Sequence, residues 1–344
     1  MGMESSALPP APAARDPRAL SLLILSDGRP GHFRQCEAMA MALARRRPVA
    51  VARTELRLRP GLPRALAARL ARALPSRAYL RVAHGLSADD FPQADLVLSA
   101  GAVTFGASIA LRRLRGAPNV IAGSLRGLDP ADVTLTLLPY ARAAQMPNHA
   151  YLLKPAAVDP DLLPPARPWG AGERKLGVLV GGPTPFAAFE AEDWSALADL
   201  LRALAARPGL DVTVATSRRT PDAAYAALEP LRTAGVSLLD FRAGAPSLQP
   251  LFAADALLVT LDSMSMISEA VAARRPTLVL EPRRTRPFRD AEIVADLAAE
   301  DRLRVLRLAG ADAAAVDAAL PAVRPMTENH LDRLADEILR RTGV

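Results

Sequence analysis

The sequence predicts an α/β protein made of two domains, and three observations support this fold class. Short apolar runs alternate with amphipathic stretches along most of the chain. This alternation stops in a proline-rich segment, residues 154–174, and then starts again. A chain of 344 residues is also too long for one small core. Short apolar strands that alternate with helices form parallel sheets covered on both faces, so we expect two Rossmann-like domains that face each other across a cleft.

The N-terminal domain is expected over residues 19–153. It follows a leader rich in proline and alanine, residues 1–18, which we expect to be disordered. The apolar runs predict its buried strands at 20–26, 49–55, 95–99, 119–122 and 133–138. The clearest amphipathic helices between them are predicted at 33–46 and 103–115.

The C-terminal domain is expected over residues 175–344. The segment before it, 154–174, holds five prolines and two glycines after Lys154, which is typical of an interdomain linker. Strands are predicted at 175–180, 211–216, 236–240, 256–260, 277–281 and 303–307. Helices are predicted at 191–206, 221–234, 263–274, 289–299 and 312–320. A last helix begins after Thr327, and we expect it to cross back and brace the N-terminal domain.

Half of the residues are hydrophobic and only 4% are aromatic, which is typical of a globular protein rather than a disordered one. The lone Cys36 allows no internal disulfide. No segment reaches the roughly 18 apolar residues of a membrane span, and the N-terminus lacks the apolar centre of a secretory signal. We therefore expect a cytoplasmic protein.

The formal net charge of +7 favours anionic partners. We expect no nucleic acid, because the chain has no nucleic-acid-binding motif and no basic run interleaved with aromatic residues. The remaining partners of this class are nucleotides and an anionic membrane, so a peripheral position at the inner membrane is the further expectation. Arginines scattered over "RALAARLARALPSRAYLR", residues 64–81, favour a solvated helix face.

The stretch "SDGRPGHFRQ", residues 26–35, joins the first strand to the first helix. Gly28 and Gly31 would let backbone amides approach a ligand at a helix N-terminus. His32, or Asp27 beside it, would then remove a proton from an acceptor. The alternative is a plain turn with an exposed histidine.

Two further turns of the same domain are candidates for the acceptor side. "SAGAVTFGASIA" follows the third strand and offers Ser99, Gly101 and Thr104. "AGSLRG" follows the fourth and offers Ser124 and Arg126. Small residues at these places equally permit close packing of helix on sheet.

In the C-terminal domain, the turns after three strands are candidates for nucleotide and phosphate binding. The first turn follows its strand directly, and the second carries two adjacent guanidinium groups that suit a diphosphate, although a surface arginine pair is the alternative. The candidates in these two turns are Gly181, Gly182, Thr184, Thr216, Ser217, Arg218 and Arg219.

The third turn, "DSMSMISEA", is the most informative stretch. Asp262, Ser263 and Ser265 form a polar turn and helix N-cap. Glu269 would follow early in the helix, where a carboxylate can accept two hydrogen bonds from a ribose diol. The alternatives are that Asp262 only caps the helix and that Glu269 only complements its dipole. Arg283, Arg284 and Arg286 on a later loop extend the anion-binding edge.

Four motifs in order, "SDGRPGHFRQ", "VGGPTP", "TSRRTP" and "DSMSMISEA", resemble the elongated-mitochondria fission factor family and its bacterial homologues over most of residues 20–340. That family is itself similar to GT-B nucleotide-sugar glycosyltransferases, including the transferase that glycosylates the lipid-linked peptidoglycan precursor. The resemblance implies a GT-B-like fold with an N-terminal acceptor domain and a C-terminal nucleotide domain. It also implies a Gly-Gly-His turn near the reaction centre, which here reads "GRPGH".

The leading hypothesis is glycosyl transfer from a nucleoside-diphosphate sugar to an envelope or lipid-linked acceptor. Arginines and helix dipoles would stabilise the leaving diphosphate, so we expect no metal and no other cofactor. The string "DPD", residues 159–161, is interpreted as part of the linker. Two alternatives remain open: a nucleotide-sugar 2-epimerase on the same architecture, and a non-enzymatic GT-B-like module that docks on membranes or on a division or fission machine.

Overall fold

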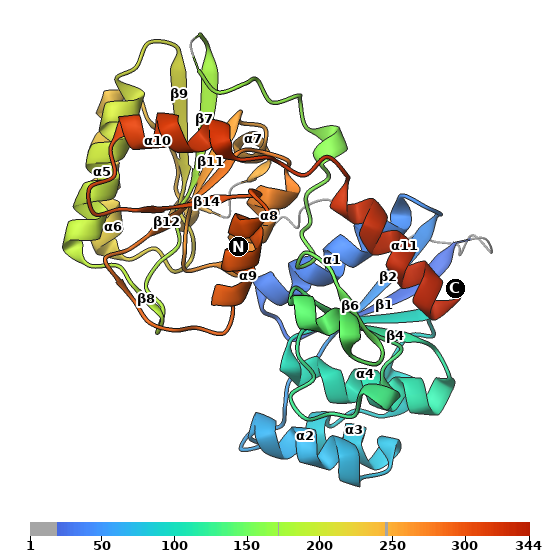
Figure 1. Cartoon of the computed structure of the whole chain (residues 1–344). Coiled ribbons are helices and arrows are strands. Elements are labelled where there is room, and N and C mark those ends of the chain that lie inside the picture. The colour runs from blue at the N-terminus through green and yellow to red at the C-terminus, as the bar shows by residue number, and fades with distance from the viewer. Residues whose placement is uncertain (1–18, 171, 245–246) are drawn as a thin grey trace. The chain divides into compact units, whose positions relative to one another are not determined.

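The structure of the chain is a computed structural model that describes residues 19–170, 172–244 and 247–344 (Figure 1). The expected leader, residues 1–18, lies outside the described residues. The chain divides into two compact units. Among the described residues, one comprises Val158–Thr327, and the other comprises residues 19–157 together with Glu328–Val344. The prediction of an α/β protein with two parallel sheets is confirmed.

The N-terminal unit is built on a six-stranded sheet in which every neighbouring pair is parallel, in the order β2-β1-β3-β4-β5-β6. The strands are β1 (Leu20–Ser26), β2 (Val49–Glu55), β3 (Leu96–Ala100), β4 (Asn119–Ala122), β5 (Leu135–Leu138) and β6 (His149–Tyr151). The strand order reverses at β1, because β2 pairs on one side of it and β3 on the other. Ligands of open α/β sheets bind beyond the carboxyl ends of the strands at such a reversal.

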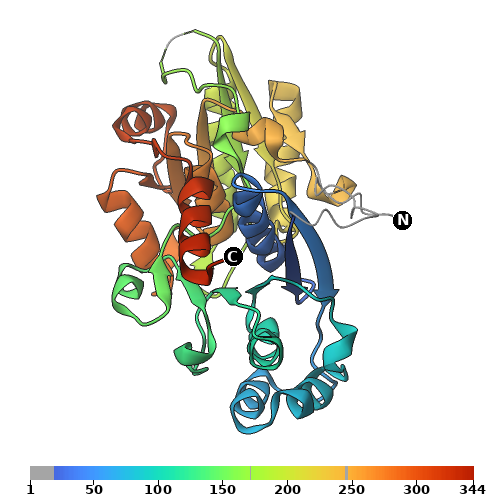
Figure 2. The same cartoon turned by 90° about the vertical axis from the view of Figure 1, so that its right-hand side faces the viewer.

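Helices cover both faces of this sheet. One face carries α1 (Pro30–Ala44) and α11 (His330–Thr342). The other face carries α4 (Ala102–Arg115), and two short helices, α2 (Arg64–Ala73) and α3 (Ser76–His84), pack on the outer side of α4 (Figures 1 and 2). Strand β1 is apolar on both sides because Leu22 and Ile24 face the first layer while Leu23 and Leu25 face the second.

The last helix belongs to the N-terminal unit. Leu331, Leu334 and Ile338 of α11 join the core that α1 forms with the sheet. The Nε atom of Arg45, which follows α1, lies 2.9 Å from Asp332 Oδ1 on α11. The return of the chain to this unit therefore rests on apolar burial and on ion pairs.

The C-terminal unit has a second six-stranded parallel sheet, in the order β10-β9-β7-β11-β12-β14. The strands are β7 (Arg174–Leu179), β9 (Leu210–Ala215), β10 (Ser237–Leu239), β11 (Ala256–Thr260), β12 (Thr277–Glu281) and β14 (Arg304–Arg307). The helices are α5 (Ala191–Ala205), α6 (Asp222–Leu228), α7 (Gln249–Phe252), α8 (Met264–Ala272), α9 (Ala291–Ala299) and α10 (Ala313–Ala319). The short strands β8 (Ala187–Ala188) and β13 (Arg284–Thr285) pair antiparallel. Here the strand order reverses at β7.

The structure corrects several predicted elements. Helix α1 begins at Pro30 and not at residue 33, because proline is well suited to a first helical position, whose N–H would be unpaired in any case. The predicted helix 221–234 ends as an α-helix at Leu228 and continues as 3₁₀ turns that contain Pro230. Where the sequence favoured a solvated helix face without bounds, at residues 64–81, the structure has α2 and α3. The helices and strands that the sequence did not predict are α7, β6, β8 and β13.

Candidate functional site

Asp27 and His32 form a hydrogen-bonded pair at the carboxyl end of β1. The His32 Nδ1 atom lies 2.9 Å from Asp27 Oδ2 and 3.1 Å from Oδ1. A carboxylate only accepts hydrogen bonds, so this contact places the proton of a neutral imidazole on Nδ1 and leaves Nε2 as an acceptor. The Asp27 side chain is 4% exposed and that of His32 is 32% exposed. The pair therefore has a fixed inner member and an outer member that solvent or a ligand can reach.

Gly101 provides the space for this pair. It is the N-cap of α4, directly after β3, and its φ of 90° is a conformation that favours glycine. A Cβ atom at this position would lie 2.8 Å from Asp27 Oδ2 and closer still to His32 Nδ1. Because β1 and β3 are neighbours at the strand-order reversal, the predicted residues Asp27, His32 and Gly101 meet at one point of the sheet edge.

The other acceptor-side candidates have different environments. Ser99 and Thr104 are fully buried, and their hydroxyls donate to the backbone carbonyls of Val120 and Gly101, so we assign them to packing. Gly31 lies inside the first turn of α1, where its carbonyl accepts from Gln35.

The remaining acceptor-side candidates lie nearer the surface. Gly28 has a φ of 74°, and its N–H donates to Ser26 Oγ. Ser124 is half-buried, and Arg126 is exposed with a left-handed φ of 52°.

A pocket of about 380 Å³ opens beside Asp27. Three guanidinium groups, those of Arg29, Arg57 and Arg64, line it together with apolar side chains that include Leu58 and Leu62. The sequence did not single out Arg57 or Arg64. Arg64 is the first residue of α2, and its place beside Asp27 depends on how α2 packs in the unit, which a local sequence pattern does not contain.

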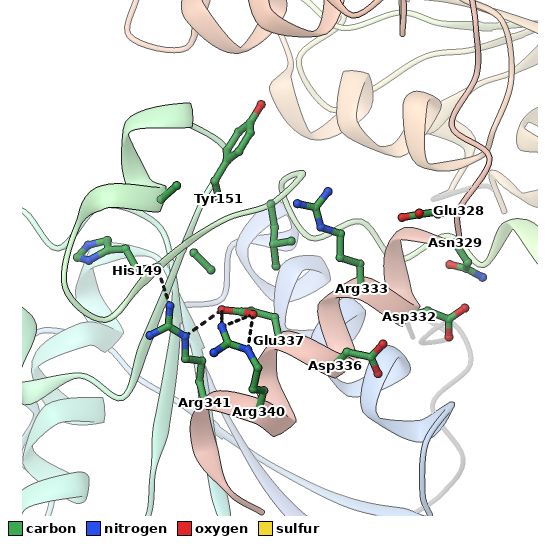
Figure 3. A pocket seen from close by; sticks show the side chains of 13 residues that line it. His149, Tyr151, Glu328, Asn329, Asp332, Arg333, Asp336, Glu337, Arg340 and Arg341 are labelled. Atoms are coloured by element: carbon green, nitrogen blue, oxygen red, sulfur yellow. Dashed lines mark hydrogen bonds and ion pairs between the residues drawn. The ribbon is translucent and has the colours of Figure 1, made fainter.

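A larger pocket of about 730 Å³ lies against β6 and α11 in the same unit (Figure 3). Its lining is mainly charged, and it contains none of the predicted site residues. Although burial raises the pKa of Glu337, hydrogen bonds from Arg340 and Arg341 outweigh this and hold that pKa below its usual value. In Figure 3 these three side chains lie against one another on α11, and a dashed line joins Arg341 to His149.

In the C-terminal unit, the Asp262 carboxylate ties three strand ends together. It accepts hydrogen bonds from Gly182 N at 3.1 Å and from Thr260 Oγ1 at 2.6 Å, and it pairs with the Arg219 guanidinium. The side chain is fully buried, and burial raises its pKa above the usual value although these three partners favour the charged form. Asp262 is therefore not the helix cap, which is Ser263: the Ser263 hydroxyl accepts from Met266 N.

The two glycines after β7 are required by this packing. A Cβ atom on Gly181 would overlap the Asp262 carboxylate, and one on Gly182 would overlap the backbone oxygen of Arg219. The hydroxyl of Thr220, which the sequence did not single out, donates to the carbonyl of Gly181 at 2.9 Å. The Gly-Gly turn is thus held in one conformation from two sides.

The turn after β9 separates into buried and exposed residues. The Thr216 hydroxyl accepts from Tyr225 and from Phe241 N, so Thr216 is a structural residue. The Ser217 hydroxyl accepts from Arg219 N at 3.2 Å within the turn. Arg218 is exposed, and its side chain has no hydrogen-bond or ion-pair partner among the described residues.

Helix α8 changes the interpretation of Glu269. Glu269 is the sixth of its nine residues, so it lies beyond the first turn, where the helix dipole has less effect on a carboxylate. Its side chain is buried, with 6% of the residue exposed. Next to it, the buried Ser268 hydroxyl has no hydrogen-bond partner among the described residues. Ser265 is half-buried in the first turn.

The remaining candidates lie around the short β8–β13 ribbon and in the linker. The Thr184 hydroxyl accepts from Ala187 N. Arg283 and Arg284 lie near the carboxylates of Asp193 and Glu190, at 3.9 Å and 3.0 Å respectively.

In the string 159–161, Asp159 caps a 3₁₀ turn, and Asp161 pairs with Arg274 at 3.0 Å. Across residues 19–170, 172–244 and 247–344 there is no group of three His, Cys, Asp or Glu side chains that could hold a metal ion, and no helix there is long and apolar enough to cross a membrane.

Comparisons with known proteins agree with this architecture. The family model described as mitochondrial fission ELM1 matches residues 151–342. The glycotransferase of kitacinnamycin is similar in structure, with a TM-score of 0.51 at 15% identity over 95% of this chain and 96% of that one. A UDP-N-acetylglucosamine 2-epimerase gives a TM-score of 0.55 at 12% identity, over 95% and 96%.

The UDP-GlcNAc 2-epimerase from Neisseria meningitidis, bound to UDP-GlcNAc, gives a TM-score of 0.52 at 12% identity, over 93% and 99%. These likenesses show the fold, which is GT-B-like. No curated protein matches the sequence closely enough to count as a relative.

Proposed function

The chain belongs to the mitochondrial fission ELM1 family, and we propose that it transfers a glycosyl group from a nucleoside-diphosphate sugar to a hydroxyl of an envelope or lipid-linked acceptor. The observation that carries this proposal is the Asp27–His32 pair with Gly101 beside it at the strand-order reversal. A general base for a hydroxyl must be an oriented group with an unprotonated nitrogen or oxygen, and the His32 imidazole with an unprotonated Nε2 meets this requirement.

In the proposed reaction, His32 Nε2 takes the proton of the acceptor hydroxyl while that oxygen attacks the anomeric carbon of the sugar. The bond from this carbon to the diphosphate oxygen breaks, and the nucleoside diphosphate leaves with the bonding electron pair. Asp27 touches neither reactant: it holds the ring and stabilises the imidazolium that forms. The contact between Asp27 and His32 Nδ1 supports a proposal that the sequence left open, with His32 as base and Asp27 as positioning residue.

We assign the donor to the C-terminal unit, at the strand-order reversal between β7 and β11. The exposed Arg218 and the N-terminal amides of α8 at Ser265 would bind the diphosphate, and the Glu269 carboxylate would accept from the ribose hydroxyls. Gly182 and Asp262 would shape the turn rather than touch the phosphate, because they bond to each other.

The first experiment is a thermal-shift panel of UDP, GDP, ADP and CMP with their sugars, since a ligand at 100 times its Kd stabilises a protein by about 2.7 kcal/mol. The selected donor is then incubated with lipid-linked acceptors, and the products are separated. We expect release of nucleoside diphosphate together with a glycosylated acceptor.

Asp27→Asn should slow this transfer about a hundredfold or more without reducing donor affinity, because the ring loses the acceptor that selects its tautomer. Asp129→Asn, in an exposed turn of the same unit, is the matched control.

The same assay separates the alternatives. An epimerised nucleotide sugar formed without any acceptor would indicate the 2-epimerase. Nucleotide binding with no turnover on any acceptor would indicate a non-enzymatic module. We further propose a cytoplasmic protein with a peripheral contact to an anionic membrane, because a lipid-linked acceptor is presented at a membrane surface.

A further inference from the structure

Helices α2 and α3 carry an unusually one-sided charge. Residues 56–86, which contain α2 and α3, hold seven arginines and neither aspartate nor glutamate. The charge of this segment therefore equals the formal net charge of the whole chain, +7. All seven arginines are exposed: Arg57, Arg59, Arg64, Arg69, Arg72, Arg77 and Arg81.

Most of these charges are unneutralised. Arg57 pairs with Glu55, and Arg72 donates to the carbonyl of Gly127. The other five side chains make no hydrogen bond or ion pair with any residue that the structure describes. A solvated helix face usually mixes both signs of charge, so a segment of one sign is a surface with a strong positive potential.

The helices present these charges on one outer layer. Both α2 and α3 pack on α4, which separates them from the sheet, so their free faces point away from the core of the unit (Figures 1 and 2). On α2, only Ala67 and Ala71 are buried. On α3, Arg77 and Arg81 are one turn apart and lie on its exposed side.

Apolar side chains are exposed among the arginines. Leu66 on α2 is 43% exposed and Val82 on α3 is 45% exposed. Leu66 lies one helical turn from Arg69, and Val82 is next to Arg81 in the chain. Exposed leucine and valine among arginines fit a lipid interface, where the apolar groups insert and the cations stay at the headgroups. Nucleic acid would instead favour exposed aromatic side chains, and the one aromatic ring of the segment, Tyr79, is buried.

We propose that the outer faces of α2 and α3, with Arg69, Arg77, Arg81, Leu66 and Val82 at their centre, dock the protein on an anionic lipid bilayer. This surface adjoins the pocket beside Asp27, because Pro63 and Arg64 at the start of α2 line that pocket. A docked bilayer would bring lipid-borne groups next to the Asp27–His32 pair. Only this last consequence rests on the proposed function.

The test is sedimentation of the full chain with vesicles of phosphatidylcholine alone, or with about one third phosphatidylglycerol. We expect binding only to the anionic vesicles. The variant Arg69→Gln, Arg77→Gln, Arg81→Gln should bind about a hundredfold more weakly, since each arginine near the surface contributes about fivefold. A matched control variant removes the same charge from exposed positions of the other unit and should bind like the parent. Its substitutions are Arg232→Gln, Arg307→Gln and Arg324→Gln.

A second variant separates apolar insertion from charge. At about 1 M salt the Debye length falls to about 3 Å, so the binding that remains reports the apolar contacts. Leu66→Ser with Val82→Ser should abolish this remainder and keep most of the binding at low salt. Circular dichroism checks that each variant is folded.

Three results would overturn the proposal: equal binding to both kinds of vesicle, equal weakening by both triple variants, or no binding to any vesicle. If the protein bound a short DNA duplex more tightly than vesicles, and the triple variant at Arg69, Arg77 and Arg81 lost this binding, the surface would be assigned to nucleic acid instead. Because no donor is present in these assays, they fail or succeed independently of glycosyl transfer. A protein that binds vesicles but transfers no sugar would overturn the proposed function alone.

Discussion

Gly101 shows how a residue without a side chain can control a site. A Cβ atom on Gly101 would lie so close to both Asp27 and His32 that it would displace the imidazole from the carboxylate. We predict that Gly101→Ala slows transfer by about 10²–10⁴-fold, because the base loses its orientation. Donor binding, which we assign to the other unit, should be unchanged, and a KM and kcat measurement separates the two effects.

The matched control is Gly123→Ala. Gly123 also has a positive φ, 130°, and also follows a strand of the same sheet, but a Cβ there would meet only Phe105, at 3.3 Å. Both variants should lose about 1–3 kcal/mol of stability from backbone strain. If the two variants lose activity equally, strain alone explains the effect and the displacement of His32 is excluded as its cause.

A ribose-binding role and a purely structural role of Glu269 predict opposite effects of its replacement on nucleotide affinity and on stability. If Glu269 accepts hydrogen bonds from the ribose, Glu269→Ala should cost about 1.5–3 kcal/mol of nucleotide binding, or about ten- to a hundredfold in Kd. As a purely structural buried carboxylate, it should cost stability and leave the affinity unchanged. Calorimetry with the nucleotide selected by the panel decides between them, with Glu300→Ala, at the exposed end of α9, as the control.

At the scale of elements, the ion pairs between the end of α1 and α11 should make the attachment of the last helix depend on pH. Hydrogen bonds from Arg45, and then Arg46, hold the pKa of Asp332 below its usual value of 3.8. A lowered folded-state pKa contributes stability that is present above 3.8 and is lost as the pH falls through the folded-state value.

We therefore predict that Asp332→Asn lowers the free energy of unfolding by about 1 kcal/mol at pH 7. The difference from the parent should shrink as the pH falls below 3.8. Urea titrations at a series of pH values measure this. Asp89→Asn, an exposed carboxylate of the same unit, is the control, and a difference for Asp332→Asn that is constant with pH would contradict the ion-pair account.

The elements also show why some of the fold could be predicted from the sequence and some could not. The long buried strands were predictable because β1 and β11 are apolar on both faces over most of their length, with polar residues only at Ser21 and at the last positions, Ser26 and Thr260. The bounds of α2 were not, because it buries only two alanines and its arginines obscure any apolar periodicity, so residues 64–81 indicated only a solvated helix face. Strand β6, three residues long at the sheet edge, has too few residues to show alternation.

The same reasoning applies to the site. Residue types identified Asp27, His32 and Gly101 one by one, but only the pairing of β1 with β3 brings them together. Asp262 was expected to touch a ligand or cap a helix, whereas it bonds to Gly182, some 80 residues earlier in the chain. Contacts between strand ends depend on the order of strands in the sheet, which a local pattern does not contain.

At the scale of the whole molecule, the excess of cations bears on how the leaving group is stabilised. The chain has 43 lysines and arginines against 36 aspartates and glutamates. A departing diphosphate gains negative charge, which either a divalent ion or fixed cations and helix N-termini can stabilise. Arg218 is exposed after β9, and the N-terminus of α8 follows β11 in the same sheet, so the C-terminal unit offers fixed positive groups for this purpose.

We therefore predict that transfer does not depend on a divalent ion. Turnover in excess EDTA should match turnover without it, whereas Arg218→Ala should slow transfer about ten- to a hundredfold, because each lost charge-assisted hydrogen bond is worth about 1.5–3 kcal/mol. The control is Arg232, an exposed arginine in the 3₁₀ turns that follow α6, and Arg232→Ala should leave the rate unchanged. Complete loss of the rate in EDTA, restored by one divalent ion, would instead assign the charge stabilisation to a metal and leave Arg218 with at most a role in binding.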